Sequence, residues 1–164
     1  SSSSSTGGIL LPEQAEAASS STSINANLLL AKNAGKKVQL DKGDTKVTQF
    51  SYAAARRAAG CVIEAVDVVM AGKADNCFCA VRPPGHHMGP RGAVDASDLA
   101  DDPEGSQGFC LLNNIAIGAA YARCVYRTDI KRVAIIDFDV HHGNGTEAIV
   151  RNVTPARKDS APRA

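Results

Sequence analysis

Apolar residues recur at helical spacing in three segments of the chain. From Ser51 to Ala71 they lie three or four positions apart, which predicts a helix with one apolar face; these positions are Ala54, Ala58, Cys61, Val62, Ala65, Val66 and Val69. Gly72 follows directly, and glycine is a typical residue just past a helix end. An alanine-rich stretch from Leu111 to about Arg127 predicts a second helix. A third, shorter helix is expected to open at Thr146-Glu147 and to end near Asn152.

Two shorter runs, Cys77–Val81 and Val133–Ile136, are apolar at every position. A short run without polar alternation predicts a strand that is buried on both faces, as in parallel sheets. Helices separate the two runs, so the pattern predicts an α/β fold whose parallel sheet is covered by helices on both faces. Two strands do not complete such a sheet. Residues 82–107 are rich in Pro, Gly and Asp, and we expect a long loop of the kind that usually serves function.

The N-terminal part of the chain differs in composition from the rest. Ser, Thr, Gly, Ala and Asn dominate residues 1–27, and such a stretch buries too little apolar surface to offset the entropy cost of ordering. We therefore expect residues 1–40 to be low-complexity and disordered. The folded domain is expected over residues 41–152, followed by an irregular tail over residues 153–164.

Charge and cysteine content exclude several classes of protein. The chain has 18 Lys and Arg against 17 Asp and Glu, which lacks the basic excess of a free-standing nucleic-acid binder. No apolar run approaches the roughly 20 residues of a membrane span, and the short runs Gly8–Leu11 and Leu28–Ala31 are not expected to be secretory signals because they lack sufficient length and a basic flank. Five cysteines at irregular spacing do not form a disulfide framework. We expect free, buried thiols in a reducing, intracellular compartment, with neither nucleic acid nor membrane as a direct partner.

Two pairs of histidines each follow one of the predicted strands. His86-His87 comes after Cys77–Val81, and His141-His142 comes after Val133–Ile136. Because ligands of parallel α/β sheets bind at the carboxyl ends of the strands, these imidazoles should meet at one edge of the sheet. The rigid Pro-Pro-Gly turn before His86 would fix where its ring and that of His87 point, and an imidazole is suited to acid–base catalysis.

Carboxylates accompany the second histidine pair. Asp137, Asp139 and His141 alternate along the chain, so in an extended backbone all three point to the same side. Asp139 and His141 are ligand types suited to zinc. Asp137 could orient a neighbouring imidazole or help to hold a second cation.

Three motifs together resemble the zinc-dependent histone deacetylases. They are Arg82-Pro83-Pro84-Gly85-His86-His87, Gly108-Phe109-Cys110-Leu111-Leu112-Asn113-Asn114 and Asp137-Phe138-Asp139-Val140-His141-His142-Gly143-Asn144-Gly145-Thr146. They occur in the family's order and spacing, and the resemblance runs from about Asp44 to Val150. The two prolines and Asn144 resemble class II members. The resemblance implies the parallel-sheet, three-layer αβα fold of the arginase and deacetylase type, incomplete in this chain.

The resemblance also implies roles for individual residues. Asp139 and His141 are similar to two of the three protein ligands of zinc. The implied catalytic group is His86, His87, Asp137 and Asn144, with His87 as general base, Asp137 paired with His86 and Asn144 near His87. Gly108 and Phe109 would bind substrate, with Phe109 lining the acetyl-lysine tunnel. Asp137 and Asp139 also resemble part of the family's structural potassium site.

The implied activity is zinc-dependent hydrolysis of acetyl-lysine on histones or other proteins, in the nucleus, the cytoplasm or both. Acetylated histone tails are the implied substrates, and corepressor complexes are a family expectation. The family's third zinc ligand, an Asp, and its oxyanion-stabilising Tyr or His lie downstream of the third motif, and nothing after Val150 matches them. The sequence therefore looks like the N-terminal half of a catalytic domain. A truncated, inactive deacetylase-like binding protein and an acetylpolyamine amidohydrolase are the alternatives.

Overall fold

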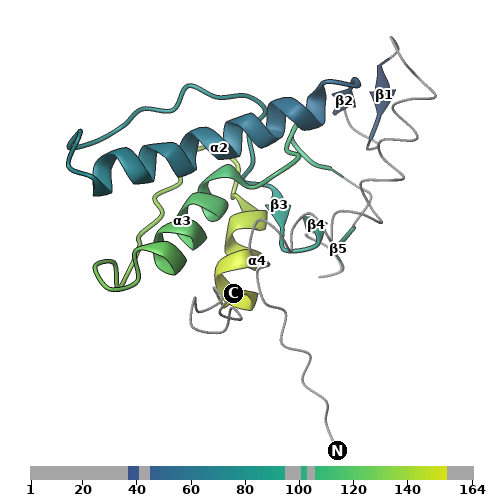
Figure 1. Cartoon of the computed structure of the whole chain (residues 1–164). Coiled ribbons are helices and arrows are strands. Elements are labelled where there is room, and N and C mark those ends of the chain that lie inside the picture. Colours follow the sequence, from purple (N-terminus) through teal and green to yellow (C-terminus); the bar gives the residue numbers. More distant parts are fainter. Residues whose placement is uncertain (1–36, 41–44, 95–100, 103–105, 155–164) are drawn as a thin grey trace, which may run out of the picture.

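In the computed structural model, the two longest helices pack side by side (Figure 1). The structure describes residues 37–40, 45–94, 101–102 and 106–154. Helix α2 spans Ser51–Met70 and helix α3 spans Asn114–Val125. Both were expected from the helical spacing of apolar residues, although α3 is shorter than the predicted helix at each end. Of the predicted disordered segment over residues 1–40, residues 1–36 lie outside the described residues, and residues 37–40 include a short strand at Val38–Gln39. Most of the predicted tail also lies outside the described residues.

Small side chains allow α2 and α3 to approach closely. Their buried residues are mostly alanines: Ala55, Ala58 and Ala59 on α2, and Ala116, Ala120 and Ala122 on α3. A Cβ atom on Gly118 would lie 2.4 Å from Cγ1 of Val62, so glycine makes room for the valine. The buried face of α2 is narrower than predicted, and Ala54 and Cys61 are exposed because α3 covers only one stripe of the helix.

The strands of the structure are short and antiparallel. β1 (Val38–Gln39) pairs with β2 (Lys46–Val47) before α2. Three further strands lie in the sequence between α2 and α3 and form a second sheet in the order β3-β4-β5. They are β3 (Met88–Gly89), β4 (Gly92–Val94) and β5 (Asp101–Asp102). Residues 82–107, predicted as a loop, therefore contain a small sheet.

Helix α4 spans Asn144–Asn152 and packs against β3 and β4. It begins two residues before the predicted Thr146 and ends where the sequence indicated. A small apolar cluster of Met88, Ala93 and Cys110 lies beneath this part of the molecule. The sheet and α4 together support the segment that carries His86 and His87.

The two predicted parallel strands are not formed. Within the described residues, neither Cys77–Val81 nor Val133–Ile136 belongs to a sheet. Phe78 is 94% exposed and Ile136 is 85% exposed, so the prediction that both runs are buried was wrong. A strand needs a hydrogen-bonded neighbour, and in the described part of the chain no other segment pairs with these two.

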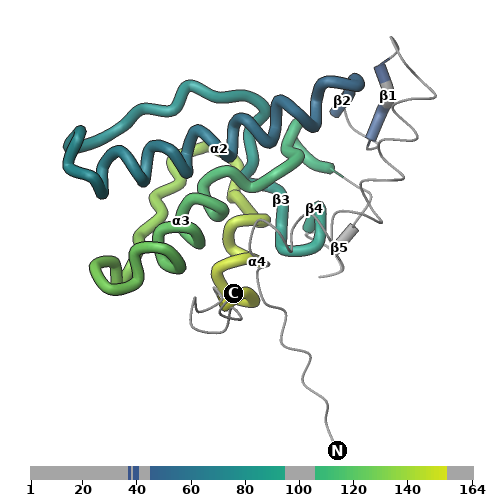
Figure 2. Tube along the Cα trace, viewed as in Figure 1, coloured from purple at the N-terminus to yellow at the C-terminus, as the bar shows by residue number. Residues whose placement is uncertain are grey.

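The first of these runs lies along α2 instead. Cys77 Sγ is 3.8 Å from the Ala65 carbonyl oxygen and Cys79 Sγ is 3.6 Å from that of Cys61. The segment therefore returns antiparallel to the helix, a path that can be followed in Figure 2. All five cysteines are free, as predicted, but Cys61 and Cys77 are exposed, and only Cys110 is fully buried. No helix among the described residues is long and apolar enough to cross a membrane.

Candidate functional site

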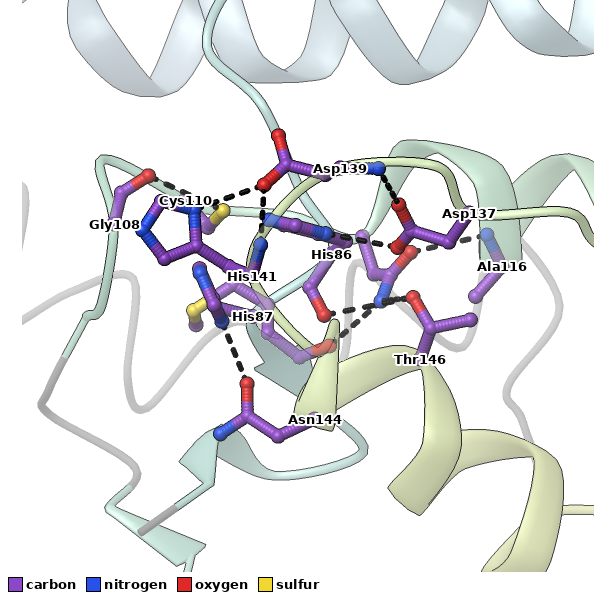
Figure 3. Close-up of polar contacts among 12 residues, drawn as sticks. His86, His87, Gly108, Cys110, Ala116, Asp137, Asp139, His141, Asn144 and Thr146 are labelled. Carbon is purple, nitrogen blue, oxygen red and sulfur yellow. Dashed lines mark hydrogen bonds and ion pairs between the residues drawn. The ribbon is translucent and has the colours of Figure 1, made fainter. Parts of the chain in front are cut away.

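Three segments distant in sequence bring the predicted site residues together. The turn after Pro84 carries His86 and His87, the segment from residue 137 to residue 141 carries the two aspartates and His141, and α4 opens with Asn144. Figure 3 shows Asn144 meeting His87 from the side opposite to Asp139. The His86 and His87 rings lie 4.2 Å apart between centroids, and those of His87 and His141 lie 5.7 Å apart.

His86 pairs with a carboxylate. Its Nδ1 lies 2.8 Å from Oδ2 of Asp137, and the other oxygen of Asp137 accepts a hydrogen bond from the Asp139 backbone N–H at 3.2 Å. Gly143 has a φ of +69°, and a Cβ at this position would lie 2.5 Å from Asp137 Oδ2. Glycine therefore provides both the left-handed backbone and the space that this pair requires.

Of the two adjacent histidines His86 and His87, His87 is the buried one, with 8% of its surface exposed. Its Nδ1 lies 2.6 Å from Oδ1 of Asn144. Gly108, predicted to contact substrate, lies against the same ring: a Cβ there would be 2.4 Å from His87 Cδ2 and 3.0 Å from Nε2. The ring is thus hydrogen-bonded to Asn144 at Nδ1, and the backbone of Gly108 lies next to Nε2.

Asp139 and His141 form a second, exposed pair. Oδ1 of Asp139 accepts a hydrogen bond from the His141 backbone N–H at 2.8 Å and lies 2.8 Å from the His141 Nδ1. The bond from the backbone, and then that from the ring, lower the pKa of the Asp139 carboxyl below its usual value. The side chains of His141 and Asp139 are 68% and 49% exposed.

The donor atoms of this pair fit part of a zinc site. Tetrahedral zinc, with bonds of about 2.0–2.2 Å, holds an imidazole nitrogen and a carboxylate oxygen about 3.4 Å apart. Nδ1 of His141 and Oδ1 of Asp139 lie 2.8 Å apart and would have to separate by about 0.6 Å to bind one ion. In the described residues no group of three or more His, Cys, Asp or Glu is placed to hold a metal ion. The two donors therefore fit two of four positions.

The implied potassium site finds no support in the described residues. Both carboxylate oxygens of Asp137 are engaged, one by His86 and one by the backbone N–H of Asp139. The geometry thus favours an orienting role for Asp137.

Phe109 lines a hollow to which none of the histidines contributes. Its backbone has a φ of +64°, its N–H donates to Thr45 Oγ1 at 3.2 Å, and the Arg82 guanidinium lies 6.0 Å from the centre of its ring. The side chain is 43% exposed and lines a hollow of about 260 Å³ next to β2 and the start of α2. Gly108 therefore reaches the histidines, whereas Phe109 faces a separate hollow.

Asn113 links three segments at the site, although it was expected only as part of the second motif. Its Oδ1 accepts from the Ala116 N–H at 3.1 Å, which caps α3, and its Nδ2 donates to the Met88 carbonyl oxygen and to Thr146 Oγ1 at 2.9 and 3.0 Å. Thr146 in turn donates its backbone N–H to the His86 carbonyl oxygen at 3.0 Å. An Asn before an alanine-rich helix is a capping signal, but nothing in the sequence indicates the other two bonds. Gln107, which binds Asn144, was also missed.

Comparison with known proteins gives one family. A model of the histone deacetylase domain matches residues 12–156. The chain is 50% identical over 114 residues to the type-2 histone deacetylase 1 of Dictyostelium discoideum, covering 70% of this chain and 7% of that protein. It is 43% identical over 106 residues to a histone deacetylase-like amidohydrolase of Pseudomonas aeruginosa, covering 65% of this chain and 24% of the other.

A solved structure shares the fold. The crystal structure of the HDA15 HD domain matches with a TM-score of 0.61 and 34% identity, covering 82% of this chain and 33% of that chain. This similarity confirms the predicted arginase and deacetylase type of fold. The chain spans a quarter or less of the two curated relatives named above and a third of the solved domain.

Proposed function

The chain belongs to the histone deacetylase family, and we propose that it supplies the histidine cluster and two metal ligands of a zinc-dependent protein lysine deacetylase. The convergence of His86, His87 and His141 with Asp137, Asp139 and Asn144 carries this proposal. The sequence separations of these contacts, 51 residues for His86 to Asp137 and 57 for His87 to Asn144, make an accidental cluster a poor explanation. The family as a whole is generally zinc-dependent.

Asp139 and His141 would hold the zinc, together with ligands beyond the described residues. When bound, zinc polarises a carbonyl and lowers the pKa of a bound water to about 7. His87 is the group suited to take a proton from the attacking water and to return it to the leaving lysine amine, because Gly108 borders its Nε2 and, among the described residues, its hydrogen bond is made through Nδ1. Asp137 orients His86 beside it.

Acetyl-lysine on histones or other proteins is the proposed substrate, and the similarity to proteins named histone deacetylases supports it. A neutral acetyl-lysine suits an apolar channel better than a charged lysine does. Action in the nucleus or cytoplasm, and assembly with corepressors, belong to this proposal as family properties.

A chimera tests the proposal directly. Residues 45–154 replace the matching segment of the HDA15 HD domain, and acetate release is measured with an acetylated histone peptide. We expect activity, and we expect His141→Ala to reduce kcat/KM by about 100-fold or more, because it removes a ligand of the catalytic metal. Bound zinc is measured in parallel and should fall with the activity.

His142→Ala is the matched control. His142 is bound to Glu147 instead, with Nε2 3.0 Å from Glu147 Oε2, and 73% of its side chain is exposed. This variant should lose much less activity than His141→Ala. A folded, zinc-loaded chimera without activity would instead favour an inactive binding protein, and a preference for acetylspermidine over the peptide would favour an acetylpolyamine amidohydrolase.

A further inference from the structure

The side-chain amide of Asn144 is fixed by three polar contacts. Its Oδ1 lies 2.6 Å from Nδ1 of His87. Its Nδ2 donates one hydrogen to the Val94 carbonyl oxygen at 2.7 Å and the other to Gln107 Oε1 at 3.0 Å. A backbone carbonyl can only accept, so rotating the amide by half a turn would set two oxygens against each other. The Val94 carbonyl and Gln107 Oε1 therefore together favour the orientation in which Oδ1 of Asn144 faces His87.

The orientation of this amide determines where neutral His87 carries its proton. A neutral imidazole has one N–H and one nitrogen with a free lone pair. Because Oδ1 of Asn144 accepts, Nδ1 of His87 must donate, and the lone pair then lies on Nε2. The reversed amide would present an N–H to Nδ1 and would select the opposite tautomer.

We propose that Gln107 and the backbone carbonyl of Val94 are positioning groups that act through Asn144 to hold neutral His87 in its Nδ1–H tautomer. The consequence for catalysis rests on the proposed function, because a free Nε2 matters there only if His87 is the general base. Gln107 acts on His87 through Asn144. Its role is to accept the second amide hydrogen of Asn144.

Two features of the chain support this arrangement. Val94 is 9% exposed and lies in β4, where it pairs with Asp101 of β5, so its carbonyl is held by the small sheet within residues 82–107. Gln107 directly precedes Gly108, whose missing side chain leaves the space beside Nε2 of His87 open. Gln107 thus binds the amide of Asn144, and the adjacent Gly108 borders Nε2 of His87, the nitrogen that carries no proton in this tautomer.

The tautomer of His87 can be read from nitrogen chemical shifts. The chain holds four histidines, so long-range proton–nitrogen correlation spectra of histidine-labelled protein resolve each ring, with His87→Gln used for assignment. Spectra are recorded at alkaline pH, well above the ordinary imidazole pKa of about 6.5. We expect a proton-bearing Nδ1 and a bare Nε2 for His87.

Two substitutions at Gln107 separate positioning from general disruption. Gln107 is exposed, so both variants should fold, which the backbone amide spectrum checks. Gln107→Glu still accepts from Asn144 and should keep the Nδ1–H tautomer. Gln107→Lys can only donate, favours the reversed amide, and should raise the population of the Nε2–H tautomer.

A wild-type His87 protonated on Nε2 would overturn the whole proposal. An unchanged tautomer in Gln107→Lys, or an equal shift in both variants, would overturn the role of Gln107. The measurement needs neither substrate nor zinc. A chimera without deacetylase activity would therefore overturn the proposed function alone, while the tautomer result would stand on its own.

Discussion

Gly108 lies so close to His87 that a methyl group has no space. Its φ is +56°, and a Cβ would be 2.4 Å from the imidazole. We expect Gly108→Ala to destabilise the chain by about 1–2 kcal/mol from the left-handed backbone alone and to displace the His87 ring. Urea unfolding measures the first effect, and the histidine spectrum reports the second.

Gly60→Ala is the matched control for this prediction. Gly60 lies inside α2, and nothing lies within 4 Å of the position a Cβ would take. Alanine favours a helix interior over glycine, so this variant should be more stable by about 0.5–1 kcal/mol. Equal destabilisation by both substitutions would contradict the close contact at Gly108.

At the scale of elements, Asn113 ties α3 to α4 and to the histidine turn. Asn113→Ala removes the cap of α3, worth about 0.5–2 kcal/mol. It also leaves the Met88 carbonyl and the Thr146 hydroxyl without the amide donor, and losing such buried bonds costs about 1–3 kcal/mol. We expect a total loss of about 2–4 kcal/mol in the free energy of unfolding, measured by denaturant titration.

Asn114→Ala serves as comparison for this variant. Among the described residues, Asn114 donates one side-chain hydrogen bond, to the Pro83 carbonyl oxygen at 3.0 Å, and its buried Oδ1 has no partner there. Its removal should cost clearly less than that of Asn113. A larger loss at position 114 would show that the cap and the Thr146 contact contribute little.

Helices α2 and α3 are also joined through one carboxylate. Asp67 on α2 accepts hydrogen bonds from Tyr121, at 2.9 and 3.0 Å, and from Tyr126, at 2.7 Å. The hydrogen bond to Asp67, followed by desolvation, raises the pKa of Tyr126 to about 12. The folded chain therefore holds this phenol proton more tightly than the unfolded chain, in which the pKa is about 10.

This shift predicts a loss of stability at alkaline pH. The contribution of Tyr126 is complete below about pH 10 and disappears as the pH rises to about 12. The difference in unfolding free energy between wild type and Tyr126→Phe should accordingly shrink across that interval. Asp67→Asn should move the tyrosinate absorbance step of Tyr126 to lower pH, and an unmoved step would exclude Asp67 as the cause.

At the scale of the whole molecule, the most exposed apolar side chains among the described residues lie on the first run predicted as a strand and directly after the second. Phe138 is 97% exposed, Val140 93% and Phe78 94%. We expect Phe138→Asp to reduce self-association of the isolated chain in sedimentation measurements. Its thermal midpoint should stay nearly unchanged, since substitutions at exposed sites usually alter stability by less than about 0.5 kcal/mol. A clear fall in the midpoint would mean that Phe138 is buried.

Sequence patterns predicted the helices better than the strands. The spacing of Ala58, Val62 and Val66 is a property of neighbouring turns, so α2 could be placed almost to the residue. A strand depends on partners far away in sequence, and Cys77–Val81 finds none among the described residues. The small sheet of β3, β4 and β5 was missed because its strands have only two or three residues each.

By itself, the sequence determined the family and supplied the candidate site residues, because histidines and aspartates at motif spacing are chemical facts of the chain. The tertiary structure decided which atoms meet. The pairing of His87 with Asn144, the Val94 carbonyl and Gln107 behind it, and the links of Asn113 to Met88 and Thr146 all join residues from different segments. Hydrogen bonds act over about 3 Å and require a defined angle, and only the folded backbone sets such distances.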